Sequence, residues 1–290
     1  MTPTAVAAAT RAVCLCGNDR FDTVFDYREP PAGEVRFAFS EGAGYRREVL
    51  CCTRCGHFLS VHDMDTSKLY EGAYVDATYG GDGLRRAFER IVALDPGRSD
   101  NVGRVSRFVA YARSHFGAQR AEGPLTMLDV GSGLCVFLHR VHATMPWIAT
   151  ALDPDERAAQ HARDCAGVNA ICGDFMRITP PARFDMVSFN KVLEHVTDPV
   201  AMLRHAHGFL APGGFIYVEL PDGEEARAEG PGREEFFIDH HHVFSLESIR
   251  VLAARAGFRC DHVERLRDPS TKFTLRAFLS APADGSGASA

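Results

Sequence analysis

Four cysteines near the start of the 290-residue chain stand in two close pairs. One residue separates Cys14 from Cys16, and two separate Cys52 from Cys55. A tight turn can present two sulfurs at once, and four thiolates satisfy tetrahedral Zn²⁺ without leaving a position for chemistry. The pattern therefore predicts a structural zinc site, against the alternative of small buried apolar residues. Three neighbours could replace one of these ligands: Cys51, His57 and His62.

A glycine-rich turn follows a short apolar pattern that predicts a strand over 125–130. Gly131 and Gly133 would let the backbone approach a ligand and would open the N-terminus of the next helix to it. The third glycine of a dinucleotide fingerprint is absent, and Cys135 stands near its place. Asp129 would repel a pyrophosphate but attract an ammonium group. These two departures disfavour a nicotinamide oxidoreductase.

Three further polar features follow in order, each at the end of a predicted strand. Asp153 could accept hydrogen bonds from both hydroxyls of a ribose. Asp174 could accept one from an adenine amino group while Phe175 flanks the ring. Asn190 lies near the switch point where doubly wound sheets bind ligands. Taken one at a time, the aspartates could instead be helix caps.

These four features in this order resemble the class I S-adenosylmethionine (SAM)-dependent methyltransferases, over residues 125–279. The resemblance implies an enzyme that transfers the methyl group of SAM, and it gives each matched residue a role. The implied roles are Asp129, Gly131 and Gly133 at the amino acid part of SAM, Asp153 at the ribose, Asp174 and Phe175 at the adenine, and Asn190 at the methyl-donor channel.

Residues 13–79 are similar to the N-terminal zinc-binding segment of some sugar C-methyltransferases and related natural-product methyltransferases. In that group a tyrosine-rich stretch covers the SAM pocket, which implies that Tyr79 contacts the cofactor. The resemblance also implies a small-molecule acceptor, such as a sugar or a natural-product intermediate.

A run of three histidines, 240–242, follows the predicted fifth strand. The sugar enzymes carry Tyr, Glu and His here, which implies that His240 is the general base and that Asp239 orients it. His241 is the alternative if the loop is offset by one residue. Phe237 replaces the tyrosine, so O- or N-methylation fits as well as C-methylation. A polar loop that caps the next helix is the competing interpretation. Further candidates near strand ends are Glu194, His195 and Glu219.

The elements that must position these residues alternate between strand and helix patterns from residue 125 onward. This alternation predicts an α/β fold with a doubly wound, Rossmann-like sheet of seven strands behind a small cysteine-rich segment. A helical pattern is expected to break at Asp95-Pro96-Gly97, and a turn is expected at 212–214. The expected divisions are a flexible N-terminus 1–10, a zinc-binding segment 11–65, a helical cover and linker 66–124, a SAM-binding domain 125–280 and a disordered tail 281–290.

Charge and hydropathy narrow the functional classes. The formal net charge is -6, and no cluster of Arg and Lys accompanies the cysteine pairs. Nucleic acid is therefore disfavoured as a partner, which counts against an RNA methyltransferase with a zinc finger. A non-catalytic SAM-fold binding protein is the other alternative. No apolar run is long enough to span a bilayer and no secretory signal is recognised, so we expect a cytoplasmic protein without membrane contact. The oligomeric state stays open.

Overall fold

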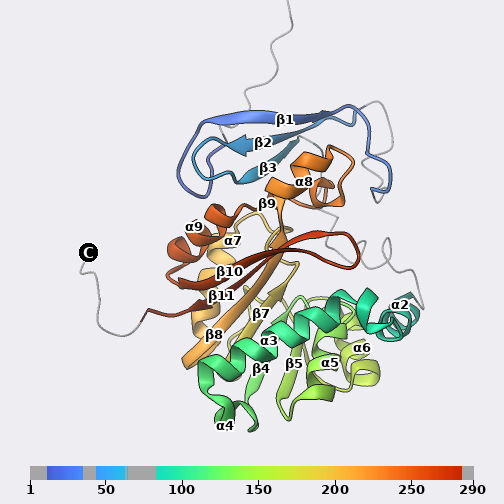
Figure 1. The fold of residues 1–290 in the computed structure, drawn as a ribbon, viewed down its shortest axis with the longest axis vertical. Coiled ribbons are helices and arrows are strands. Elements are labelled where there is room, and N and C mark those ends of the chain that lie inside the picture. The colour runs from blue at the N-terminus through green and yellow to red at the C-terminus, as the bar shows by residue number, and fades with distance from the viewer. Residues whose placement is uncertain (1–11, 35–43, 63, 65–82, 283–290) are drawn as a thin grey trace, which may run out of the picture.

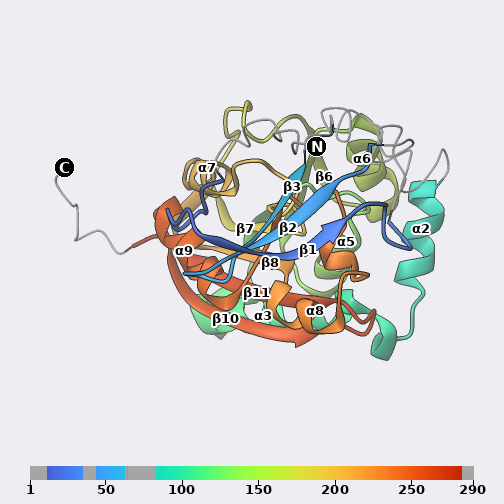
Figure 2. The ribbon, with the colours of Figure 1, turned by 90° about the horizontal axis from the view of Figure 1, so that it is seen from above.

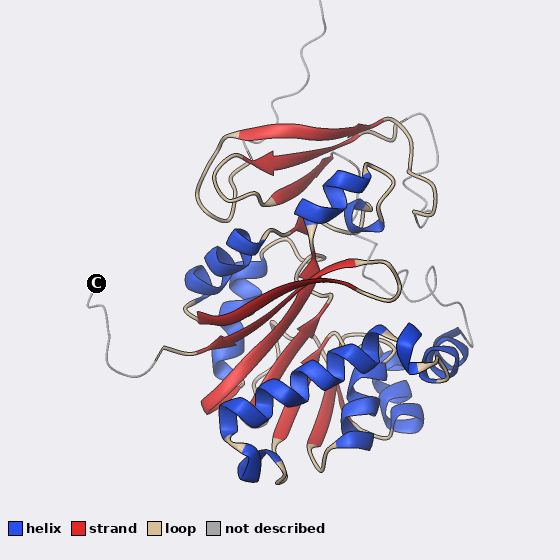
Figure 3. Cartoon of the chain, in the orientation of Figure 1, coloured by secondary structure: helices blue, strands red, loops and turns tan. Residues whose placement is uncertain are grey.

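A computed structural model describes residues 12–34, 44–62, 64 and 83–282. Its larger part is a seven-stranded sheet with helices on both faces (Figures 1 and 3). The strands are β4 (Thr126–Val130), β5 (Ile148–Asp153), β6 (Asn169–Cys172), β7 (Phe184–Asn190), β8 (Leu210–Pro221), β10 (Arg259–Arg267) and β11 (Phe273–Ser280). Their order is β10-β11-β8-β7-β4-β5-β6. The strands from β8 to β6 are parallel to one another, and β11 runs antiparallel to both of its neighbours, β8 and β10. The predicted doubly wound sheet is confirmed.

Two apolar layers hold the helices on this sheet. On α3 (Asp100–Phe116), the buried residues Val105, Phe108 and Ala112 share one face. They pack with α5 (Val136–Thr144) against Trp147 on one side of the sheet. α7 and α9 pack on the other side, where Leu203 is buried. The helices are α2 (Gly83–Val92), η3 (Pro96–Arg98), α3 (Asp100–Phe116), α4 (Ala118–Ala121), α5 (Val136–Thr144), α6 (Glu156–His161), η4 (Ala162–Ala166), α7 (Pro199–His205), η5 (Ala206–Gly208), α8 (Gly223–Glu229), η6 (Glu234–Phe236) and α9 (Leu246–Ala256). In the described ranges, none of these helices combines the length and the apolar character needed to cross a membrane.

A second sheet lies over the carboxyl ends of the large sheet's parallel strands (Figure 2). It is antiparallel, in the order β1 (Phe21–Tyr27), β2 (Arg47–Cys52), β3 (Phe58–His62) and β9 (His242–Val243). The last strand, β9, comes from the histidine run almost two hundred residues further along the chain. The two sheets are in close contact, because a Cβ at Gly223, just after β8, would lie 2.4 Å from Cδ2 of Phe58. The N-terminal segment is therefore built into the mouth of the large sheet.

Local expectations are met in one place and wrong in another. The predicted break falls between α2 and α3, where Asp95 accepts a hydrogen bond from the backbone of Gly97. The turn expected at 212–214 is wrong, because β8 already begins at Leu210 and carries these residues as an irregular stretch. Gly213 has a φ of +74°, and a Cβ at Gly214 would lie 2.5 Å from a backbone oxygen of β7. The two glycines let the strand kink without leaving the sheet.

Other expectations fall outside the described residues. These are the N-terminus 1–10 expected to be flexible, the tyrosine-rich stretch with Tyr79, and nearly all of the tail 281–290.

Ser245 joins the two sheets and gives a test of their coupling. Its side chain caps α9 by accepting from the backbone N–H of Ser248 at 2.9 Å, and it donates to the carbonyl of Cys55 at 2.5 Å. We expect Ser245→Ala to lower the free energy of unfolding by about 2 kcal/mol, because a helix cap and a buried hydrogen bond are lost. Urea unfolding measures this. Ser106→Ala, at an exposed position of α3, is the control and should change it by less than about 0.5 kcal/mol. Equal effects of the two substitutions would contradict the coupling.

Candidate cofactor site and cysteine cluster

A cavity of about 960 Å³ opens where β4, β5 and β7 end. Its volume lies in the upper part of the range for small-molecule sites. Every described residue of the expected cofactor set lines it: Asp129, Gly131, Gly133, Asp153, Asp174, Phe175 and Asn190. Tyr79 lies outside the described residues. Residues from four separate strand ends thus meet at one place.

Asp129 forms the floor of the cavity and is only 2% exposed. Its Oδ1 accepts hydrogen bonds from the Ser188 hydroxyl and the Asn190 amide, both at 2.6 Å. Burial raises the pKa of Asp129 to about 7, although these hydrogen bonds and the Arg104 charge act in the opposite direction. A cationic ligand group beside this carboxylate would stabilise its charged form. Among the described residues, the buried Oδ1 atom of Asn190 has no hydrogen-bond partner, so it offers a ligand an acceptor.

The glycine turn and Asp153 form the wall next to this floor. Oδ2 of Asp153 accepts from the backbone of Gly133 at 2.9 Å, and Oδ1 accepts from the backbone of Asp155 at 3.0 Å. Gly133 has a φ of +47°, and open space lies where a Cβ would stand. Gly131 has a φ of +67°, and a Cβ there would lie 2.8 Å from Val192. The turn therefore needs glycine at both positions and leaves room for a ligand above the carboxylate.

Asp174 and Phe175 occupy the far end of the cavity. Oδ1 of Asp174 accepts from the backbone of Met176 at 2.9 Å, and the side chain remains about half exposed. Phe175 is only 3% exposed, because its ring packs against Phe189 and Phe209 in the core. The ring therefore supports this end of the cavity from behind as well as lining it.

The histidine run approaches the cavity from the side of the small sheet. Among the expected catalytic residues, His241 lines the cavity, as does His195 after β7. His240 packs edge-on against His195, with 4.9 Å between ring centroids, and its Nδ1 lies 2.8 Å from the Glu235 carbonyl. The backbone carbonyl of Asp239 lies 2.8 Å from Nδ1 of His195. His240 is not among the residues that line the cavity, but its ring contacts His195, which is. The role of general base at His240 therefore stays a prediction.

Glu219 does not face an acceptor, and its candidacy was wrong. The side chain is completely buried and forms ion pairs with Arg104 and Arg276, with 3.1 Å between Glu219 Oε2 and Arg276 Nε. The hydroxyl of Tyr217 donates to it at 2.7 Å. Burial raises the pKa of Glu219, but the positive charges of Arg104, Lys191 and Arg276 outweigh it and hold the pKa below its ordinary value. Sequence reasoning also missed Arg104 and Lys191 as cavity residues, because no motif marks either one.

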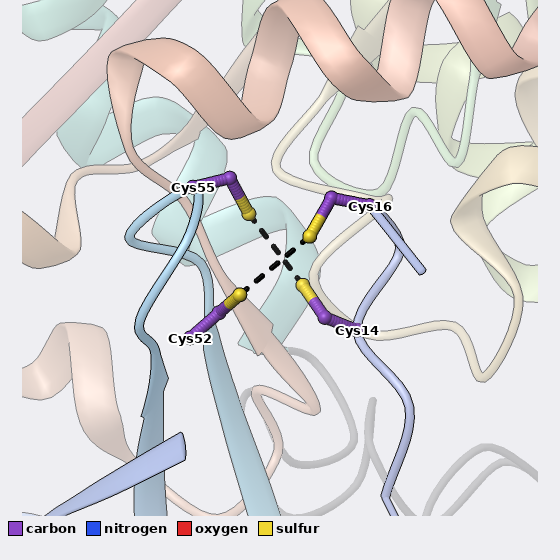
Figure 4. A group of neighbouring side chains, drawn as sticks. All are labelled: Cys14, Cys16, Cys52 and Cys55. Carbon is purple, nitrogen blue, oxygen red and sulfur yellow. Dashed lines mark hydrogen bonds between the residues drawn. The ribbon is translucent and has the colours of Figure 1, made fainter. Parts of the chain in front are cut away.

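The two cysteine pairs converge on one point, as Figure 4 shows. The Sγ atoms of Cys14 and Cys55 are 3.5 Å apart, those of Cys16 and Cys52 are 3.6 Å apart, and all four lie within 4.8 Å of one another. Sulfurs bound tetrahedrally to zinc at about 2.3 Å would be about 3.8 Å apart. The cysteines are not disulfide-bonded. The four side chains could therefore hold a zinc ion with small adjustments.

The alternative ligands take no part in this cluster. Sγ of Cys51 lies 3.9 Å from the backbone carbonyl of Cys52. His57 is fully buried and its Nε2 lies 3.0 Å from Nδ1 of His242. His62 stacks on His241. The single-residue gap of the first cysteine pair is thus no obstacle to a four-sulfur set.

A parallel sheet closed by an antiparallel strand pair, with a glycine turn opening on a nucleoside-sized cavity, defines a protein of the SAM-dependent methyltransferase class. The model of the methyltransferase domain family matches residues 101–263, which is more than half of the chain. The chain belongs to this family, which confirms the resemblance found in the sequence.

Curated relatives match a shorter stretch. The ubiquinone biosynthesis O-methyltransferase of Paramagnetospirillum magneticum is 34% identical over 121 residues, which covers 37% of this chain and 48% of that protein. The protein of the same name from Caulobacter vibrioides is 35% identical over 111 residues, covering 35% and 43%. The chain therefore spans about half the length, or less, of the curated relatives it matches.

Solved structures share the fold. The 1,6-didemethyltoxoflavin-N1-methyltransferase of Burkholderia thailandensis, solved with S-adenosylhomocysteine, has a TM-score of 0.53 at 17% identity and covers 87% of this chain and 98% of its own. The magnesium protoporphyrin IX methyltransferase of Synechocystis has a TM-score of 0.50 at 13% identity, covering 74% and 97%. Such identities show the fold alone.

Proposed function

We propose that this protein transfers the methyl group of SAM to a small-molecule acceptor. The observation that carries the proposal is the pair of buried carboxylates, Asp129 and Asp153, on adjacent walls of one cavity beside a glycine turn. SAM bears an ammonium group at one end and a ribose in the middle, and these two groups suit the two carboxylates. The fold and the family support the same function.

The reaction requires an acceptor atom in line with the methyl group and the sulfur. As the acceptor's lone pair forms a bond to the methyl carbon, the carbon–sulfur bond breaks and S-adenosylhomocysteine remains. The residues of this chain would hold SAM through Asp129, Asp153 and Asp174, and would place the methyl group beside Asn190. The net charge of -6 and the size of the cavity favour a small molecule over nucleic acid. The O-methyltransferase names of the curated relatives favour an oxygen acceptor.

We also propose that Cys14, Cys16, Cys52 and Cys55 hold a structural zinc ion. Two N–H groups point at one of these sulfurs, since the Asn18 amide lies 3.3 Å and the Arg54 backbone 3.4 Å from Sγ of Cys52. Such hydrogen bonds stabilise a thiolate, which is the form that binds metal. Four protein ligands leave no position for a substrate, so the ion would fix the N-terminal segment in place.

Asp153→Ala tests the cofactor site. We expect this substitution to weaken the binding of S-adenosylhomocysteine about 100-fold, because two hydrogen bonds from ribose hydroxyls to a carboxylate are worth roughly 3 kcal/mol together. Isothermal titration calorimetry measures the affinity. Asp164→Ala is the matched control at an exposed aspartate outside this cavity, and it should bind as the wild type does. A wild-type protein that binds neither SAM nor S-adenosylhomocysteine would reject the function.

Cobalt(II) substitution tests the zinc site. Thiolate ligands give cobalt an intense charge-transfer absorption that nitrogen and oxygen ligands do not give. We expect this absorption in the wild type and in Cys172→Ser, an exposed cysteine outside the cluster, and a much weaker one in Cys16→Ser. Identical spectra for the two variants would exclude the four-sulfur site.

His240→Gln tests the expected base. Glutamine can still donate to the Glu235 carbonyl but cannot take up a proton, so we expect kcat to fall by about 100-fold or more. The affinity for S-adenosylhomocysteine should stay within about twofold of the wild type. Turnover is followed as S-adenosylhomocysteine release with acceptors found by screening small alcohols, phenols and amines.

His241→Gln is the comparison for this test, because His241 is the alternative base and lines the cavity. A large fall in kcat for His241→Gln with little change for His240→Gln would transfer the role to His241.

A further inference from the structure

In the part of the chain that the structure describes, Glu194 is a completely buried carboxylate without a hydrogen-bond partner. The side chain is 0% exposed, and neither Oε1 nor Oε2 has a hydrogen bond. The cation closest along the chain, Lys191, instead donates from Nζ to the Thr274 hydroxyl at 3.1 Å. Burying a charged carboxylate is costly unless something neutralises it or bonds to it. A native structure that keeps such a group needs a reason for it.

Two imidazoles face this carboxylate. One ligand atom each from Glu194, His195 and His240 lies within 4.8 Å of the others. His195 directly follows Glu194, whereas His240 arrives from the loop before β9. That loop is fixed to the same place because the Glu194 carbonyl accepts from the backbone of His241 at 2.8 Å and of His242 at 3.1 Å. The cluster is therefore held together by the backbone, independently of its side chains.

Both imidazoles are oriented in the same way. Nδ1 of His240 lies 2.8 Å from the Glu235 carbonyl, and Nδ1 of His195 lies 2.8 Å from the Asp239 carbonyl. A carbonyl oxygen only accepts, so each Nδ1 carries the proton. Each Nε2 is then the basic nitrogen of its ring. Histidines that bind metals are commonly fixed in this manner, with the other ring nitrogen donating to a carbonyl or a carboxylate.

We propose that Glu194, His195 and His240 bind a divalent transition-metal cation at the edge of the cavity. Two imidazoles and one carboxylate form a ligand set that binds Zn²⁺ and Fe²⁺ and leaves positions open for a substrate. Donor atoms at about 2.1 Å from a shared ion lie roughly 3 to 4 Å apart, so small side-chain rotations from the observed positions complete the site. Because His195 also lines the cavity, a cation bound beside it would be accessible to an acceptor in the cavity.

In the proposed methyl transfer, the cation would bind and activate the acceptor. This role of the cation rests on the proposed function. An acceptor hydroxyl, phenol or enol bound through oxygen would lose its proton to water more readily. The acceptor oxygen would then attack the methyl carbon of SAM while the carbon–sulfur bond breaks and S-adenosylhomocysteine leaves. In this arrangement Nε2 of His240 would bind the cation, so His240→Gln would lower kcat through loss of the cation as well as loss of a base. Oxygen acceptors would be preferred over carbon or nitrogen acceptors.

Mn²⁺ is the probe for this site, because it takes oxygen and nitrogen ligands and is poorly suited to four thiolates. We would titrate the full-length protein, with its cysteine cluster filled with zinc, and measure free Mn²⁺ by electron paramagnetic resonance. We expect one saturable site per chain. Glu194→Gln should raise the Kd for Mn²⁺ at least tenfold. Removing a residue that only supports a metal ligand already weakens binding roughly 10- to 100-fold, and here a ligand itself is removed. Calorimetry with S-adenosylhomocysteine is run on every variant.

Glu247→Gln, at an exposed position of α9, is the matched control and should bind Mn²⁺ as the wild type does. His240→Gln supplies a second ligand variant if Glu194→Gln does not fold. The proposal is overturned if the wild type binds no Mn²⁺ saturably, or if a folded ligand variant binds it unchanged. Intact binding of S-adenosylhomocysteine in those cases would leave the methyltransferase function standing. Loss of that binding in the wild type would reject the function without touching the metal result.

Discussion

The pairing of β3 with β9 is the constraint on which the mouth of the cavity depends. β9 is only two residues long, yet it joins the N-terminal sheet to the loop that carries the histidines. The backbone N–H of Ser60 donates to the His241 carbonyl at 3.0 Å, and the N–H of His241 donates to the Glu194 carbonyl at 2.8 Å. One residue of the histidine run is thereby fixed from both sides. Cys52 and Cys55 of the cysteine cluster lie at the turn between β2 and β3. Contacts that fix this turn therefore also fix β3 and, through the pairing, β9.

A buried ion pair holds the same loop from behind. The Arg47 side chain is completely buried, donates to the Phe236 carbonyl at 2.6 Å and pairs with Glu34 at 3.3 Å. Glu34 in turn accepts from the backbone of Ile238 at 2.7 Å. A buried pair of this kind contributes little net stability, but removing one partner is strongly destabilising. Its consequence here is geometric, because the backbone just before His240 is fixed by two charged residues of the N-terminal segment.

Sequence reasoning succeeded where the signal is local and failed where it is long-range. The break at Asp95-Pro96-Gly97 was expected where it is observed, because the Asp95 side chain caps the short helix η3 and Pro96 begins it. The glycine turn and the strand ends were likewise readable. The partners of Glu219 were not, since Arg276 lies 57 residues away and the intervening chain carries no pattern for the pair. Pro212-Gly213-Gly214 misled for a related reason, because a turn signal and a bulge within a strand use the same residues.

The charges around the cavity explain which ligands it suits. Arg104 lines the cavity, but Glu219 neutralises it through an ion pair. Asp129 and Asp153 are buried at the cavity wall, and burial raises the pKa of each above its ordinary value. These two buried carboxylates have hydrogen-bond donors but no ion pair with a basic residue in the described part of the chain, so their charge favours a cationic ligand. Glu194, at the edge of the cavity, is also a buried carboxylate. In the described part of the chain its oxygens accept no hydrogen bond at all. A cofactor with an ammonium and a sulfonium group would balance the charge of Asp129 and Asp153, and the proposed divalent cation would balance that of Glu194.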